Sequence, residues 1–228
     1  MAWRDDWRRV RAIARKDVTT ELRAKAGFNS TASLGVTILI LLGLALGPDA
    51  QALRDAAVGA VWLALLFSGV LAFNRSFQVE LESGALEPLL LYPGPRWTIF
   101  AGKLLGNLLF LGLMVAIVVT VGVVLFSVEI PARWPTLLGV LALGVVGLVV
   151  LGTFYASMAS RSRAREVLLP LLLFPMLVPA LVAATTASKA LLGADLMHDA
   201  DAWIRLLAAY DVIFLIATFL AFEHVIEA

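Results

Sequence analysis

The sequence predicts an all-α membrane protein that crosses the bilayer with six helices. Of its 228 residues, 61% are hydrophobic and 15% are charged, and the mean hydropathy is +0.93. Water-soluble domains are about 45–50% apolar and about 25% charged. The apolar residues gather into six blocks with few charges, each close to the length of about 20 residues that a helix needs to cross the hydrocarbon core. This composition excludes a soluble enzyme, a disordered tail and a fibrous repeat.

The six blocks are predicted to be helices because they lack the alternating pattern of a membrane β-barrel strand. In chain order they cover residues 30–46, 56–73, 98–127, 136–159, 167–188 and 203–222. The first block is short and polar at its start, so we expect it to pack on neighbouring helices or to be thinly covered by lipid. The third is the longest and must tilt, kink or extend beyond the bilayer.

The distribution of Lys and Arg predicts that both termini lie in the cytoplasm. In that orientation all but four of the 18 basic residues lie on the cytoplasmic side, in keeping with the cation excess of cytoplasmic loops. The four on the outer side are Arg54, Arg133, Lys189 and Arg205. The tryptophans that precede spans three, four and six, where indole rings anchor in the interface, are Trp97, Trp134 and Trp203.

Residues 1–28 are predicted to form an amphipathic helix ahead of a six-helix transmembrane domain over residues 29–228. Its apolar positions recur every three or four residues and are Trp3, Trp7, Val10, Ala14, Val18 and Leu22. We expect this helix to lie on the cytoplasmic leaflet, with aromatic rings among the headgroups and cations near anionic lipid. It is either a positive anchor or an elbow beside the first span that faces a cytoplasmic partner. A cleaved signal peptide is disfavoured because acidic residues interrupt the charged region.

The connection between the second and third spans, residues 74–97, is long and acidic. Its apolar residues recur at helical spacing at Phe77, Leu81, Leu86 and Leu90. They predict a short cytoplasmic helix that lies across the membrane face. Gly84 can break or redirect this helix, and prolines after it end the segment before the third span. The three glutamates, Glu80, Glu82 and Glu87, either point into water or take cationic or N–H partners.

Three polar residues fall inside the predicted spans: Lys103, Asn107 and Asp211. An ionised carboxylate near the bilayer centre costs about 2.5–3.5 kcal/mol on insertion scales, so Asp211 should face the bundle, a partner helix or a polar cavity. It is either a packing partner or a conduit residue. Lys103 either snorkels to the cytoplasmic face as an anchor or forms a salt bridge to the acidic segment. Glycines four apart beside it, at 102 and 106, permit close helix approach.

The sequence shows no catalytic constellation. It contains no Cys, which excludes disulfides, thiolate nucleophiles and Cys-type metal sites. The Walker A phosphate cradle and the H-E-x-x-H and G-x-S-x-G signatures are also absent. We therefore expect a non-catalytic chain without a bound metal.

The acidic segment resembles a known family signature. Residues 82–93 run Glu82-x-Gly84-x-Leu86-Glu87-x-Leu-Leu-Leu-x-Pro93, which is similar to the E-x-G-(S/T)-L-E-x-L-L-x-(S/T)-P motif of ABC-2-type transporter permeases. Pro88 and Tyr92 depart from that motif. Together with Phe77, Glu80, Lys103 and the proline spacing of residues 169–179, the chain resembles the CcmB family, haem exporter protein B of bacterial cytochrome c maturation, over nearly its whole length.

The resemblance implies a permease subunit of an ATP-driven ABC-type complex for haem export or haem-chaperone release, in the bacterial inner (cytoplasmic) membrane. The residues that would contact the ATPase are Phe77, Glu80, Glu82, Gly84, Leu86, Glu87 and Pro93. The implied partners are an ABC ATPase (CcmA-like) that binds ATP, a haem-handling membrane subunit (CcmC-like), a haem chaperone (CcmE-like), a second membrane subunit, same or different, and the lipid bilayer, with no nucleic acid.

Haem is the possible cargo, and its ligands are implied to lie mainly on partner subunits. His198, in the outer connection before the last span, is either a solvated loop residue or a haem contact. The alternative functions are an ABC-2 permease for another cargo, such as a polysaccharide, lipid or drug, and a non-transporting membrane scaffold whose charged segments recruit proteins.

Overall fold

The structure, a computed structural model, describes every residue except 1, 24, 83, 85–94, 161–164, 194–198 and 228. All regular secondary structure among the described residues is helical. The helices are α1 (Ala2–Arg23), α2 (Ala26–Leu46), α3 (Ala50–Glu82), α5 (Trp97–Leu125), α6 (Trp134–Ala159), α7 (Arg165–Leu192) and α8 (Asp199–Glu227). Six of them, all but α1, contain stretches long and apolar enough to cross a membrane. The prediction of an all-α protein with six membrane-spanning helices is confirmed.

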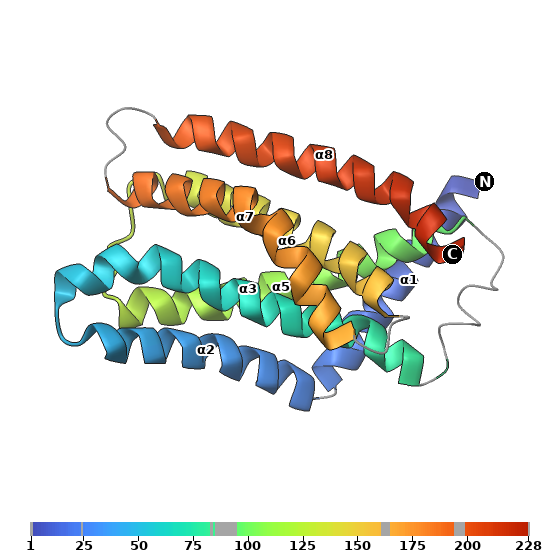
Figure 1. The fold of residues 1–228 in the computed structure, drawn as a ribbon, viewed down its shortest axis with the longest axis horizontal. Coiled ribbons are helices and arrows are strands. Elements are labelled where there is room, and N and C mark those ends of the chain that lie inside the picture. Colours follow the sequence, from blue (N-terminus) through green and yellow to red (C-terminus); the bar gives the residue numbers. More distant parts are fainter. Residues whose placement is uncertain are drawn as a thin grey trace.

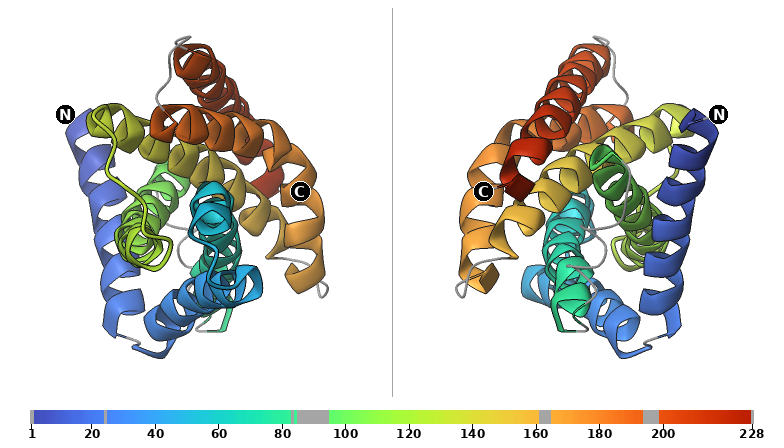
Figure 2. Two further views of the ribbon diagram at one scale, coloured as in Figure 1. Left: turned by 90° about the vertical axis from the view of Figure 1, so that its left-hand side faces the viewer. Right: turned by 90° about the vertical axis from the view of Figure 1, so that its right-hand side faces the viewer.

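The six long helices lie side by side along the longest axis of the molecule, and α1 crosses them at one end (Figure 1). Both termini lie at that end, as expected of a chain that crosses the same layer six times. The views along this axis in Figure 2 show α1 on the outside of the bundle, where it packs mainly on α5. The assignment of this end to the cytoplasm stays a prediction.

The core of the bundle is built around α6, which packs on α3, α5, α7 and α8. Two glycines of α6 face large buried rings of α3. A Cβ atom at Gly144 would lie 2.2 Å from the Trp62 ring, and one at Gly152 would lie 2.1 Å from the Phe73 ring. These two glycines let α3 and α6 approach closely.

The helix of the second span is longer than the sequence predicts. Residues 74–82 continue α3 without a break, so in this part the prediction of a separate helix across the membrane face is wrong. The sequence 74–82 contains neither Gly nor Pro, and nothing in it interrupts the helical hydrogen bonding. The chain turns only at Gly84, whose φ of 65° is unfavourable for other residues. Gly84 is therefore the break that the sequence predicts.

The amphipathic helix is present as α1, but the middle of its apolar face packs on protein rather than lipid. Val10, Ile13 and Ala14 are buried against the rest of the chain. The α1 and α5 helices can approach closely because Gly102 of α5 has no side chain. A Cβ atom there would lie 2.7 Å from the Cβ of Ile13. The centre of α1 is therefore a protein contact, and the expected position on the cytoplasmic leaflet stays a prediction.

The ends of α1 remain accessible. Trp3 is 74% exposed, Trp7 is 42% exposed, and Leu22 near the other end is 42% exposed. Contact of these residues with lipid headgroups stays a prediction. The helix therefore has a protein-bound centre and apolar side chains that reach the surface toward both ends.

Gly102→Ala should loosen the docking of α1, because the added methyl group collides with Ile13. Over-packing of this kind typically costs about 1–3 kcal/mol. Gly112→Ala is the matched control: it changes the same residue type in the same helix, at a position where a Cβ atom meets nothing within 4 Å. Thermal unfolding in detergent and protease cleavage at the arginines of α1 measure the effect. Equal behaviour of the two variants would contradict close α1–α5 packing.

Candidate functional site

Lys103 lies at the centre of a buried group of charges in the second turn of α5. Only 1% of its side chain is exposed. A buried ammonium group is strongly unfavourable unless it is paired with anions and hydrogen-bonded. Of the two interpretations that the sequence leaves open, a snorkelling anchor and a salt bridge to the acidic segment, the structure confirms the salt bridge.

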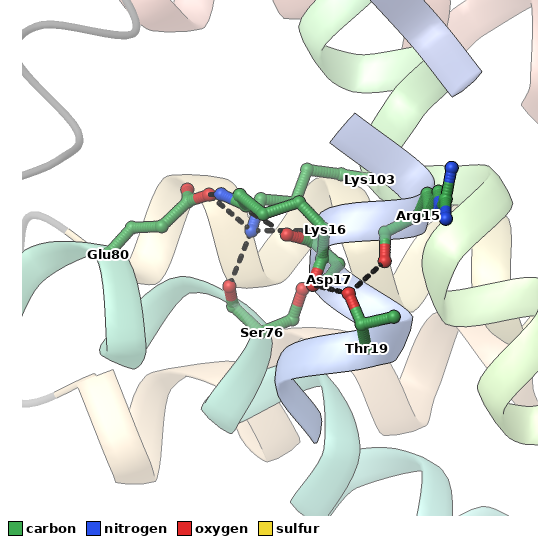
Figure 3. Close-up of polar contacts among 7 residues, drawn as sticks. All are labelled: Arg15, Lys16, Asp17, Thr19, Ser76, Glu80 and Lys103. Atoms are coloured by element: carbon green, nitrogen blue, oxygen red, sulfur yellow. Dashed lines mark hydrogen bonds and ion pairs between the residues drawn. The ribbon is translucent and has the colours of Figure 1, made fainter. Parts of the chain in front are cut away.

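The ammonium group of Lys103 binds α1 and α3 at once. Its Nζ atom lies 2.9 Å from Oε1 of Glu80 and 3.0 Å from Oδ2 of Asp17 (Figure 3). It also donates a 2.6 Å hydrogen bond to the backbone carbonyl of Ser76. The Phe77 ring lies 5.1 Å from Nζ, at a distance suited to a cation–π contact. One side chain of α5 thus holds three helices together.

Lys16 of α1 brings a second cation to the same carboxylate. Its Nζ donates a hydrogen bond to Oε1 of Glu80 and lies 3.3 Å from Oδ1 of Asp17. Burial by itself lowers the pKa of the Lys16 ammonium. The hydrogen bond to Glu80 and the charges of Asp17 and Glu80 outweigh this effect, so the pKa is raised above its ordinary value of 10.5. Lys16 therefore stays charged at neutral pH.

A second ion pair joins α1 and α3 farther from the end of α3. Nε of Arg75 lies 3.2 Å from Oε1 of Glu21, and both side chains are largely buried. Nη1 of Arg75 also donates a long hydrogen bond of 3.5 Å to Oγ of Ser30 in α2. The last turns of α3 are therefore bound through charged groups to α1, α2 and α5.

We call these six residues the ion-pair cluster: Lys16, Asp17, Glu21, Arg75, Glu80 and Lys103. They line a polar cavity of about 200 Å³ that continues into the bundle as far as Phe110. The cluster has three cations and three carboxylates, and each charge lies beside an opposite one. Because the charges compensate one another, this arrangement is suited to holding helices in one position rather than to catalysis.

Of the residues that the sequence assigns to ATPase coupling, Glu80 belongs to the cluster and Phe77 lies beside its Lys103. Phe77 and Glu80 are 5% and 2% exposed, so they face inward and do not form an open docking surface. Glu82 is the last residue of α3, and Gly84 lies in the exposed turn that follows. The remaining predicted residues lie outside the described part of the chain: Leu86, Glu87, Pro93 and His198.

Four members of the cluster were not predicted as site residues: Lys16, Asp17, Glu21 and Arg75. A signal for two of them is present in the sequence. Asp17 and Glu21 continue the apolar face that begins with Val10 and Ala14, at the same spacing of three and four residues. Acidic residues on the buried face of a basic helix indicate cationic partners elsewhere in the chain.

The other two intramembrane polar residues lie outside the cluster. Nδ2 of Asn107, one turn further along α5, donates a 2.9 Å hydrogen bond to Oγ1 of Thr153 in α6. Asp211 of α8 is 5% exposed and lies beside Gly147 of α6, where a Cβ atom would be 2.7 Å from its Oδ1. Neither carboxylate oxygen of Asp211 has a hydrogen-bond partner within the described ranges. It faces the interior of the bundle, as the sequence predicts.

The family model of the CcmB protein matches residues 8–228 of this chain. The relatives named "Heme exporter protein B" include three from different bacteria. The one from Rhodobacter capsulatus is 31% identical over 174 residues, 76% of this chain and 79% of the relative. The one from Paracoccus denitrificans is 31% identical over 189 residues, which are 82% of this chain and 86% of the relative. The one from Pseudomonas aeruginosa is 33% identical over 154 residues, which are 67% of this chain and 68% of the relative. The chain belongs to the CcmB family and is a multi-pass membrane protein.

Lys103→Met should destabilise the protein strongly, because it removes the buried cation between Glu80 and Asp17 and leaves them only the half-exposed Lys16. Removing one partner of a buried ion pair typically costs about 3–5 kcal/mol. Adding Glu80→Gln to this variant should restore part of the stability. The control is Arg8→Met, which breaks the exposed Arg8–Asp5 pair and should change little. Thermal unfolding in detergent ranks the stabilities of these variants. A Lys103→Met protein as stable as the control would show that the pairing does not constrain the fold.

The docking of α1 should weaken at alkaline pH. The folded-state pKa of Lys16 is raised, so its contribution to stability is complete below 10.5 and is lost as the pH rises through the higher folded value. Maleimide labelling of Ala14→Cys, buried against α5, measures undocking, and Ala12→Cys on the exposed side corrects for thiol reactivity. Lys16→Arg, which stays charged, should shift the undocking of α1 to higher pH. A pH dependence of labelling that is the same in this variant and in the protein with Lys16 would contradict a role for Lys16.

Proposed function

We propose that this member of the CcmB family is the permease subunit of an ATP-driven ABC-type complex that serves haem export in bacterial cytochrome c maturation. The name of its relatives, "Heme exporter protein B", supports haem as the cargo. Six apolar helices support a membrane-embedded subunit. The sequence contains no Walker A motif, so the proposal assigns ATP to a separate CcmA-like subunit.

We place the ATPase at residues 82–93 of the acidic segment. This stretch begins at Glu82, the last residue of the helix that carries Arg75 and Glu80. Both residues are ion-paired to other helices. A force applied to the segment would therefore act on α1 and α5 through charged contacts and not on α3 alone. The buried contact of Lys103 with both Glu80 and Asp17 is the observation on which this proposal mainly rests.

From α5 the movement would continue into the bundle. One turn beyond Lys103, the hydrogen bond from Asn107 to Thr153 connects α5 with α6. The packing of α6 on α7 and α8 would then extend the response across the other spans. The output would be transport of haem itself or release of a haem-loaded CcmE-like chaperone, with a CcmC-like subunit and a second membrane subunit in the same assembly.

The proposal requires the end of the bundle that holds α1 to face the cytoplasm of the inner membrane. The excess of Lys and Arg on that side supports this orientation. The segment after α3 is then on the side where ATP is available. A tag placed in residues 85–94 and detected at the outer surface of intact cells would contradict the proposed docking.

Charge reversal by Glu82→Lys or Glu87→Lys should weaken association with the ATPase, because the segment would lose its attraction for cationic or N–H partners. Co-purification from detergent-solubilised membranes measures the association, and the membrane fraction shows whether the chain is still integrated. Asp5→Lys is the control, since it reverses an exposed carboxylate of α1. Unchanged co-purification by both variants would refute this mechanism.

The same variants, introduced into the source bacterium, test the cargo. If the complex serves haem export, the content of c-type cytochromes should fall in the two segment variants and remain normal with Asp5→Lys. If cytochrome content stays normal although ATPase association is lost, the proposed ATPase contact still holds but haem is not the cargo. The cargo is then another ABC-2 substrate, such as a polysaccharide, lipid or drug.

A further inference from the structure

An apolar cavity lies at the end of the bundle opposite α1, among α3, α5, α6 and α7 (left in Figure 1). Its volume is about 270 Å³. The polar groups of its deep wall satisfy each other. Nε1 of Trp62 donates a 3.3 Å hydrogen bond to Oγ of Ser188, which itself donates to the carbonyl of Ala184. An internal water needs about two to four polar partners. This wall offers none, so the cavity favours an apolar occupant.

The cavity opens where the bilayer would lie against the bundle. The residues at its mouth are apolar and exposed: Ile130 is 75% exposed, and Trp134 and Leu138 are each 53% exposed. Pockets for drug-sized ligands are typically about 300–1,000 Å³. The cavity lies slightly below that range, and its apolar lining suits hydrocarbon.

A polar recess of about 500 Å³ adjoins the mouth of this cavity. The two share Val58, Val128, Glu129 and Leu192 as lining residues. The recess adds two cations, Arg54 and Lys189, at the level of the ends of α3 and α7. It also adds one further carboxylate, Asp55, whose Oδ1 accepts a 3.0 Å hydrogen bond from Gln51.

The two cations of the recess differ in what they bind. Arg54 lies 3.9 Å from Glu129, a loose and exposed ion pair. Lys189 is exposed, and its ammonium group makes no ion pair or hydrogen bond with any residue that the structure describes. Among the residues that the structure describes, a cation without an ion pair therefore stands beside the opening of an apolar cavity, near the end of α7.

We propose that the cavity and the recess together bind one phospholipid molecule. Its acyl chain occupies the apolar cavity, and its phosphate is bound by Lys189, with Arg54 as the second cation. The charge of the phosphate complements the ammonium of Lys189, which has no ion pair among the described residues, and the apolar lining of the cavity favours an acyl chain over water. The site depends only on the chain being embedded in a membrane and is independent of the proposed haem export.

Val123→Phe tests the cavity, because Val123 lines it and a phenyl ring would fill it. Val124→Phe is the matched control: the same change at the next position of α5, where the side chain is 75% exposed and faces away. The full-length protein is purified in detergent, and native mass spectrometry counts the phospholipids that it retains. We expect one per chain in the wild type and in Val124→Phe, and at least a tenfold loss in Val123→Phe. Equal retention by all three would overturn the proposal.

Lys189→Gln tests the headgroup contact, with Arg205→Gln, an exposed cation of α8 outside the recess, as its control. Retention of added phosphatidylglycerol or phosphatidylethanolamine should fall several-fold only in Lys189→Gln. No difference between the two variants, or displacement of the bound phospholipid by equimolar haem, would overturn the assignment to a phospholipid.

The wild-type chain provides a test that does not depend on the folding of a variant. In vesicles that contain a phospholipid with a photoreactive group at the end of its acyl chain, cross-links should concentrate on the cavity residues of α3, α5 and α6. Cross-links spread equally over the exposed face of α8 would show ordinary bilayer contact and overturn the proposal.

Discussion

A buried ammonium group must be neutralised by anions, and at Lys103 this requirement determines the arrangement of one end of the molecule. The side chain is 1% exposed, and its two carboxylate partners come from helices that are distant in sequence. Loss of either partner would leave a buried charge poorly compensated. Electrostatic pairing therefore positions α1, α3 and α5 as much as apolar packing does. The small residues of α5 make the pairing possible, because they let α1 come close enough for Asp17 to reach Lys103.

The α3 helix connects two chemically different ends. Its first half contributes Val61 and Trp62 to the apolar cavity, and its last turns contribute Arg75 and Glu80 to the ion-pair cluster. The helix has no Pro over its whole length and runs as one element from Ala50 to Glu82. Rigid elements of this kind transmit displacement between distant sites. A change at the acidic segment and the occupancy of the cavity would thus act on the same helix.

The sequence predicts the six spans because crossing the hydrocarbon core demands a length and a composition that few other structures share. It also gives two alternatives for Lys103, a snorkelling anchor and a salt bridge to the acidic segment. The ion pair to Asp17 could not be predicted from local pattern, because it depends on how α1 is placed against α5. Hydropathy places the end of α3 too early because residues 74–82 are largely polar, and a drop in hydropathy resembles the end of a membrane span. The backbone hydrogen bonds of a helix do not depend on hydropathy, so α3 continues to Glu82. The inward orientation of Asp211 follows from the cost of exposing a carboxylate to lipid.

The position of α1 has a consequence for how the protein is made. Translation adds about 5–20 residues per second, so α1 leaves the ribosome several seconds before the glycines of α5 on which it packs. During that interval the ion-pair partners on α3 are already made, but the centre of the apolar face lacks the surface of α5 that buries it. The membrane surface is an environment that can accommodate this face until then. Emergence of α5 completes the tertiary site and converts a surface-bound helix into a structural part of the bundle.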